Sequence, residues 1–166
     1  MDEMRFGTRT IAGRKWMHKG YRPKCEQKYG YSYCYLFQAT QPSSGKSFSM
    51  FLPNMDRECF QLFIEEFNKA YPNQTLIMDN AGSHHAKWED KPKPEVEIIF
   101  LPPYSPDFNP QERVFQELKK PLKGKCFEDI DQIKKIIEEA VKDIEIRPQK
   151  VMKWTAWNWI VKHNST

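Results

Sequence analysis

Two carboxylates stand where a rigid element would present them. Asp79 directly follows the apolar run 76–78, and Glu112 follows the proline-rich turn that ends at Pro110. Functional sites of open α/β sheets gather at the carboxyl ends of strands, which makes Asp79 a strong candidate. Phosphoryl-transfer chemistry with Mg²⁺ needs hard oxygen ligands held by rigid elements. The two residues therefore predict a divalent-metal site.

Each of these carboxylates also has a purely structural interpretation. An Asp-Asn pair such as Asp79 and Asn80 is common turn chemistry after a strand. Glu112 lies three residues after Asn109 and could be the glutamate of a capping box, a role that does not exclude metal binding. Local sequence alone leaves both alternatives open.

Two adjacent histidines, His84 and His85, follow Asp79 within a polar stretch. They could act near a phosphate or bind a metal, although paired histidines in polar loops are more often simply exposed. No Cys or His partner stands at ligand spacing, so the sequence does not favour zinc. The cysteines are scattered without a CxxC pair, which indicates reduced thiols in a cytoplasmic protein.

The elements that would position these residues follow from apolar periodicity and turn residues. Aromatic residues at every second position over 29–37 predict a strand, and their stripe is more typical of packing than of nucleic-acid stacking. The predicted strands cover residues 2–9, 29–37, 46–52, 74–79 and 96–101, with a hairpin turn at 42–45. The predicted helices cover residues 55–71, 109–120, 128–144 and 150–163, with a helical turn at 84–90 and a linker at 91–94.

This order of elements predicts an α/β fold in which a mixed sheet has helices on both faces. The early strands can pair antiparallel as hairpins, whereas the two later strands join through crossovers and should lie parallel. The 166 residues fit one domain, and no run of 18 apolar residues indicates a membrane helix. Residues 1–50 hold nine Lys or Arg and three Asp or Glu, which suits a polyanionic partner or reflects chance clustering.

Four motifs resemble those of DDE transposases of the mariner superfamily, most closely the branch found in bacterial insertion sequences. The stretch LPPYSPDFNPQE resembles the family signature LPPYSP-x-x-NP-x-E. MDNAGSHH resembles the family's strand that ends in Asp-Asn with a His five residues after the Asp. The opening DEMRFG resembles the family's DE-x-x-F, and WMHKGYRP resembles W-x-x-K-G-x-x-P. The resemblance covers about residues 2–145.

The resemblance implies an RNase H-like fold and a catalytic triad of Asp2, Asp79 and Glu112. These residues would hold two Mg²⁺ ions, for which Mn²⁺ can substitute, and Asn80 and His84 would contact DNA or support the metal ligands. The implied reaction is cleavage of DNA phosphodiester bonds at element ends, followed by strand transfer into target DNA. The implied partner is DNA, which a homodimer of the protein would bind. The implied location is the cytoplasm, in association with the nucleoid.

The resemblance also sets expectations about organisation. Family members usually carry N-terminal helix-turn-helix domains, so residues 1–166 are expected to be the catalytic domain alone, with a separately encoded helix-turn-helix subunit as a further partner. Because the first predicted strand begins at Asp2, the sheet is expected to be incompletely paired there, with Asp2 poorly held. Two alternatives are an inactive remnant or accessory subunit that binds DNA weakly, and another RNase H-like nuclease such as a resolvase, which the LPPYSP signature disfavours.

Overall fold

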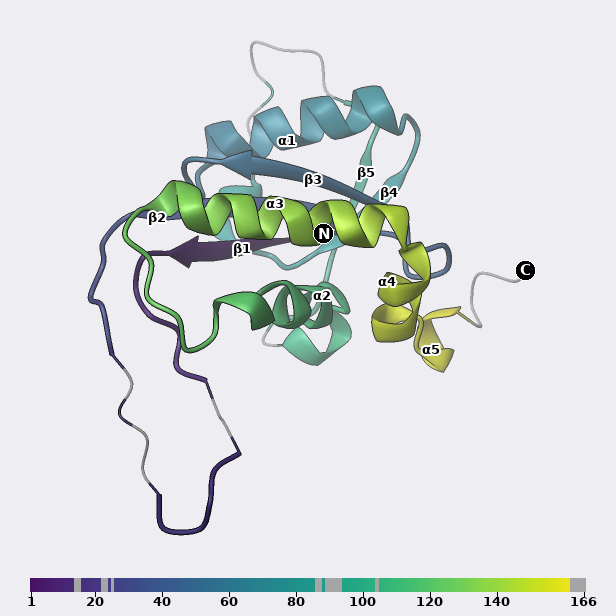
Figure 1. Cartoon of the computed structure of the whole chain (residues 1–166). Coiled ribbons are helices and arrows are strands. Elements are labelled where there is room, and N and C mark those ends of the chain that lie inside the picture. Colours follow the sequence, from purple (N-terminus) through teal and green to yellow (C-terminus); the bar gives the residue numbers. More distant parts are fainter. Residues whose placement is uncertain are drawn as a thin grey trace.

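Strands form the centre of the molecule, and helices cover both faces (Figure 1). The computed structural model describes residues 1–13, 16–21, 24, 26–85, 88, 94–103 and 105–161. Its elements are β1 (Asp2–Gly7), β2 (Tyr33–Thr40), β3 (Ser47–Leu52), α1 (Arg57–Ala70), β4 (Thr75–Met78), β5 (Glu97–Phe100), α2 (Gln111–Leu118), α3 (Ile130–Ile146), α4 (Pro148–Thr155) and α5 (Asn158–Val161). Short 3₁₀ turns lie at η1 (Gly82–His84), η2 (Pro106–Phe108) and η3 (Lys120–Leu122).

The strand pairing is mixed, as expected. Strands β1, β2 and β3 form an antiparallel sheet in that order, and β4 pairs in parallel with β5. Between the described parts of the two sheets, the Met1 nitrogen donates a hydrogen bond of 2.7 Å to the Ile77 carbonyl. The sheet was expected to be incompletely paired at the start of β1. On the β2 side, the pairing covers the whole of β1 and sets Asp2 opposite Gln38.

Two hydrophobic cores hold the helices against opposite faces of the strands. Alternate residues of a strand point to opposite faces, so Met4 and Phe6 of β1 contribute to the core beneath α2, α3 and α4. Helix α1 buries Phe60, Phe63 and Ile64 in the other core, against the opposite side of β2. Each buried Phe or Ile side chain contributes roughly 1.5–3 kcal/mol. The expected α/β fold with helices on both faces is confirmed.

The strand predicted over residues 29–37 was wrong in its first half. Gly7 is the last β1 residue in the ladder, opposite Tyr33, so Tyr29 and Tyr31 lie beyond the pairing and are exposed. They belong to a long excursion between β1 and β2, whose described residues 8–13, 16–21, 24 and 26–32 we call the arm. The base of the arm contacts the segment before α3, where the Gly124 nitrogen donates to the Ile11 carbonyl at 2.8 Å, and the outer part projects away from the sheet (Figure 1). Period-two aromatics alone did not reveal that the partner strand ends.

The helix predicted over residues 150–163 was also wrong as a single element. It is divided into α4 and α5, and between them the Trp157 nitrogen donates a hydrogen bond of 2.8 Å to the Thr155 carbonyl. Trp154 packs against the core beneath α3, whereas Trp159 is half exposed. The helical turn expected at 84–90 lies earlier, in η1. The described residues leave out part of that range, most of the linker expected at 91–94, and Cys25.

The start of α2 follows the predicted capping pattern, displaced by one residue. The helix begins at Gln111 after Pro110, and the Asn109 side-chain oxygen accepts a hydrogen bond from the Gln111 nitrogen at 3.1 Å. No hydrogen bond of the Glu112 carboxylate is found in the described part of the chain, so the capping box gains no support. Glu112 is therefore free of a structural role in the cap.

Candidate active site

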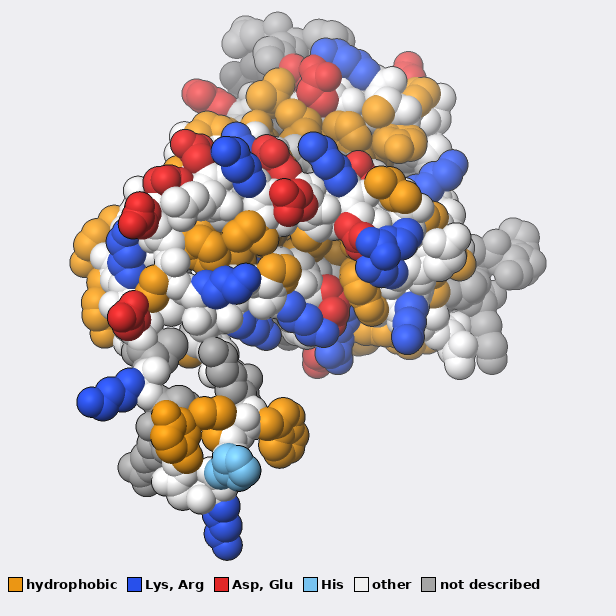
Figure 2. All heavy atoms as spheres, viewed as in Figure 1, with side chains coloured by type: hydrophobic (Ala, Val, Ile, Leu, Met, Phe, Trp, Pro, Cys, Tyr) orange, Lys and Arg blue, Asp and Glu red, His pale blue; other side chains and the backbone are white. Residues whose placement is uncertain are grey.

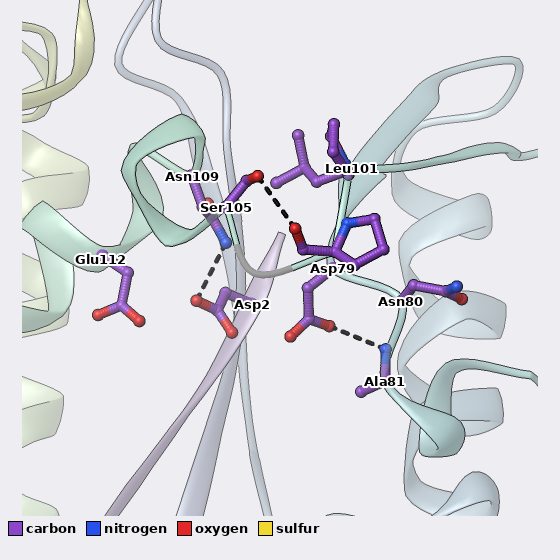
Figure 3. Close-up of a pocket in the computed structure, with 10 residues that line it drawn as sticks. Asp2, Asp79, Asn80, Ala81, Leu101, Ser105, Asn109 and Glu112 are labelled. Carbon is purple, nitrogen blue, oxygen red and sulfur yellow. Dashed lines mark hydrogen bonds between the residues drawn. The ribbon is translucent and has the colours of Figure 1, made fainter.

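One hollow of about 490 Å³ contains all three carboxylates that the sequence singles out. Asp2 comes from the start of β1, Asp79 from the end of β4, and Glu112 from the first turn of α2 (Figure 3). In Figure 3, Asp2 lies between the other two side chains. The wall also contains Asn80, Ala81, Leu101, Pro102, Pro103, Ser105 and Asn109. The fold thus brings together carboxylates that are far apart in the sequence.

Asp2 is firmly held, contrary to expectation. Its Oδ2 accepts a hydrogen bond of 3.1 Å from the Asn109 side-chain amide, and its Oδ1 accepts one of 2.8 Å from the Glu3 nitrogen. Burial raises the pKa of Asp2 to about 7, and the nearby charges of Glu3 and Glu112 act in the same direction. Asp2 is therefore a carboxylate that a bound cation would favour in its ionised form.

A network of buried amides fixes the start of α2 above the sheet. The Gln111 side-chain nitrogen donates to the Gln38 side-chain oxygen at 2.6 Å, and Gln38 donates in turn to the Ser49 hydroxyl at 2.9 Å. Gln38 and Gln111 are 0% and 2% exposed, so these bonds satisfy amides that water cannot reach. Since Glu112 directly follows Gln111, the network also fixes the backbone position from which the Glu112 side chain extends.

Asp79 is tied to His84 and, through it, to β1. The Nδ1 of His84 lies 2.9 Å from both the Asp79 carbonyl and its Oδ1, and the Nε2 lies 2.8 Å from Oε1 of Glu3. Burial opposes the charge on His84, but the hydrogen bond to Glu3 and the charges of Glu3 and Asp79 outweigh it and raise the His84 pKa. His84 is buried, so it faces these partners rather than the open hollow.

Asn80 lines the hollow and contacts the second histidine. Its side-chain oxygen lies 2.7 Å from Nε2 of His85, whose ring packs 5.2 Å from that of Phe100. Asn80 is exposed on the same side as Asp79. It can therefore reach a molecule that enters the hollow, whereas His84 cannot do so directly.

The donor set fits a hard divalent cation. The three carboxylates supply the oxygen ligands that Mg²⁺ prefers. Within the described part of the chain, no three His, Cys, Asp or Glu side chains already converge closely enough to enclose one ion. Glu112 is exposed, so its side chain has room to rotate towards Asp2.

Sequence reasoning did not find the supporting residues. Glu3 was present only as a letter of the first motif, and Gln38 and Gln111 had no assigned role. A charged or amide residue within a buried strand is unusual enough to mark Glu3 and Gln38 in retrospect. Their partners are distant in sequence, so no local pattern could have named them.

Comparison with known sequences decides the family. The family described as DDE superfamily endonuclease matches residues 1–134. The chain belongs to this family. The DDE membership expected from the four motifs is thereby confirmed. In the structure, Tyr104 of the LPPYSP signature lies outside the described residues. An uncharacterized protein of Sinorhizobium fredii (strain NBRC 101917 / NGR234), y4pE/y4sA, is 31% identical over 135 residues, which is 76% of this chain and 96% of the relative.

Solved structures of the Mos1 transposase share the fold of this DDE family member. The Mos1 strand transfer complex aligns over 93% of this chain with a TM-score of 0.60 at 17% identity. The Mos1 mariner paired-end complex with Mn aligns over 92% of this chain with a TM-score of 0.56 at 15% identity. The chain spans about half the length of these transposases, 52% and 53%. At this identity the likeness shows the fold, which is RNase H-like as expected.

No helix in the described residues is long and apolar enough to cross a membrane.

Proposed function

We propose that this chain is the catalytic domain of a DDE transposase, which cleaves DNA phosphodiester bonds and transfers DNA strands. The observation that carries the proposal is the shared hollow of Asp2, Asp79 and Glu112. Membership of the DDE endonuclease family supports the reaction class. The proposed domain extends over residues 1–166.

The proposed ligands of the catalytic metal are Asp2, Asp79 and Glu112. We take Mg²⁺ as the ion, with Mn²⁺ able to substitute, because the donors are carboxylate oxygens and a Mos1 neighbour contains Mn. Two such ions, when bound, supply a nucleophile and stabilise the leaving oxygen of an in-line displacement. The proposed role of Asn80 is to contact a phosphate oxygen or a water molecule, which its position in the wall of the hollow supports, and that of Asn109 is to orient Asp2 through their hydrogen bond.

The proposed partners follow from the charge distribution and from the neighbours. The basic first third of the chain suits DNA, and the Mos1 neighbours are a paired-end complex and a strand transfer complex. We therefore include element ends and target DNA as substrates and a homodimer as the DNA-bound form. A separately encoded helix-turn-helix subunit and a nucleoid-associated cytoplasmic location complete the proposal.

Metal binding by Asp79 variants tests the proposal first. We expect wild-type protein to bind Mn²⁺ in titration calorimetry, and Asp79→Asn to lose measurable binding because one charged ligand is replaced by an amide. Asp107→Asn is the matched control. Asp107 is exposed on the proline-rich turn before α2 and does not line the hollow. The titrations are repeated with a short DNA duplex, because phosphate oxygens can complete the coordination.

Cleavage provides the second half of this test. With Mn²⁺ and supercoiled plasmid, Asp79→Ala is expected to abolish nicking while its thermal unfolding stays cooperative, and Asp107→Asn is expected to nick like wild type. Nicking by Asp79→Ala at the wild-type rate would rule out the assigned triad. A wild-type protein that binds the duplex but no Mn²⁺ would instead support an inactive, DNA-binding form of the fold.

A further inference from the structure

Glu3 is a buried carboxylate that faces the opposite side of β1 from Asp2. Adjacent strand residues point to opposite faces, so Asp2 faces α2 whereas Glu3 faces α1. The Glu3 side chain is 5% exposed and that of His84 is 1% exposed. A charged group at such depth is strongly disfavoured unless it is paired and hydrogen-bonded. The buried pair of Glu3 and His84 therefore does more than make the surface of the protein soluble.

The hydrogen bonds of His84 determine how its ring is oriented. Nδ1 faces the Asp79 carbonyl and Oδ1, both at 2.9 Å, and Nε2 faces Oε1 of Glu3 at 2.8 Å. A carbonyl oxygen only accepts hydrogen bonds, so Nδ1 is the donor to the Asp79 carbonyl. The ring of Phe60 packs against the imidazole with centroids 5.0 Å apart. The imidazole is thus fixed between the start of β1 and the end of β4.

The consequence reaches the Asp79 carboxylate. Its Oδ1 lies 2.9 Å from Nδ1 of His84 in an ion-pair contact and accepts a 3.3 Å hydrogen bond from the Ala81 nitrogen. Among the described residues no hydrogen bond to Oδ2 is found, and the Asp79 side chain lines the hollow. Because the Asp79 side chain is 60% exposed, packing alone does not select its rotamer. The ion-pair contact with the buried His84 ring is therefore the anchor of this exposed carboxylate.

We propose that His84 is a positioning residue that orients the Asp79 carboxylate for Mg²⁺. The proposal rests on the proposed function, since it concerns the same site. Mg²⁺ demands near-ideal octahedral geometry, whereas Ca²⁺ accepts flexible arrangements of oxygen ligands. Loss of orientation at Asp79 should therefore weaken Mg²⁺ binding more than Ca²⁺ binding. Loss of folded protein would lower the binding of both ions equally.

The variants separate hydrogen bonding from ring packing and from charge. Glu3→Gln removes the buried charge, so it serves as the background in which His84 can be changed without leaving a carboxylate unpaired. In that background, His84→Phe keeps a ring against Phe60 but has no donor for Asp79. His84→Asn is the rescue variant, because its amide nitrogen can occupy the place of Nδ1. Asp143→Asn is the matched control, since it removes a carboxylate that is ion-paired on α3, outside the hollow.

Calorimetric titration with Mg²⁺ and with Ca²⁺, each in the presence of a short DNA duplex, gives the decisive readout. Glu3→Gln and Glu3→Gln/His84→Asn are expected to bind Mg²⁺ within about threefold of wild type. Glu3→Gln/His84→Phe is expected to bind it about tenfold or more weakly, the usual cost of losing a residue that orients a metal ligand, with a smaller change for Ca²⁺. Asp143→Asn is expected to match wild type for both ions.

Two results would overturn the positioning role. One is a folded Glu3→Gln/His84→Phe protein that binds Mg²⁺ as tightly as Glu3→Gln. The other is an equal loss for Mg²⁺ and Ca²⁺ that tracks a fall in melting temperature. If that variant does not fold, Glu3→Gln/His84→Leu replaces it under the same criteria. Wild-type protein that binds neither ion would contradict the proposed function itself, and with it this role.

Discussion

Asp2 lies in surroundings that disfavour its own charge. Burial raises its pKa to about 7, and Glu3 and Glu112 add negative charge nearby. An ordinary Asp titrates near pKa ~3.9, so between about pH 4 and pH 7 the folded protein binds a proton that the unfolded chain releases. Without metal, the contribution of Asp2 to the free energy of unfolding therefore decreases as pH rises through this window.

This environment predicts a stabilised Asp2→Asn protein. At pH 8 in the presence of a chelator, we expect Asp2→Asn to exceed wild type in stability by on the order of 2–4 kcal/mol, because the amide carries no buried charge. The difference should shrink as pH falls towards 4. Thermal and urea unfolding across this pH range measure it.

The exposed carboxylate of Asp107 supplies the comparison. Asp107→Asn is expected to change stability by no more than about 0.5 kcal/mol at every pH, as surface substitutions usually do. An Asp2→Asn protein that is less stable than wild type at pH 8 would show that the hydrogen bond from Asn109 outweighs the burial of charge.

At the scale of elements, the start of α2 depends on the buried amides beneath it. Gln111 bonds to Gln38 of β2, and Asn109 bonds both to the Gln111 nitrogen and to Asp2 of β1. One helix start therefore contacts two neighbouring strands through hydrogen bonds. This arrangement couples the position of the Glu112 carboxylate to that of Asp2.

We expect Gln38→Leu to destabilise the protein by about 1–3 kcal/mol, since it leaves the buried Gln111 amide without its acceptor. The double variant Gln38→Leu/Gln111→Leu should lose less than the sum of the two single variants, because both partners are removed together. Denaturant unfolding of the three variants measures this coupling. Additive losses would show that the two amides do not depend on each other.

At the scale of the whole molecule, the arm carries exposed aromatic and basic side chains away from the sheet (Figures 1 and 2). Trp16, Tyr21 and Tyr31 are fully or largely exposed, at 102%, 62% and 87%. Exposed Arg9, Lys19 and Lys24 lie on the same excursion. Such a surface suits contacts with phosphates, which carry little sequence information.

DNA binding should therefore be weak, salt-sensitive and indifferent to sequence. Replacing Arg9, Lys19 and Lys24 by Gln is expected to lower the slope of log affinity against log salt by up to about 0.9 per lost phosphate contact. Fluorescence anisotropy of labelled duplexes over a series of KCl concentrations measures the slope. The triple variant Lys69, Lys135 and Lys142 to Gln removes the same charge from α1 and α3 and should keep the wild-type slope.

Equal slopes in the two triple variants would show that the arm does not contact DNA phosphates. Tight binding of one sequence over others at physiological salt would contradict the phosphate-based model of recognition.

The amino-acid sequence by itself determined the features that depend on neighbours in the chain. Apolar runs and turn residues predicted the order of strands and helices, and the position of Asp79 after a strand and of Glu112 at a helix start. The cap at Asn109 was predictable for the same reason, because capping joins residues two or three positions apart. The motifs added the fold, the family and Asp2.

Only the tertiary structure decided what holds these residues in place. The bond between Asn109 and Asp2 joins residues 107 positions apart, and that between His84 and Glu3 joins residues 81 positions apart. The end of the ladder at Gly7, which left Tyr29 and Tyr31 exposed, likewise depends on a distant partner strand. Hydrogen-bond partners across a sheet are set by register and by helix placement, and neither is encoded in local periodicity. For this reason the sequence predicted the candidate carboxylates, and the fold revealed the residues that orient them.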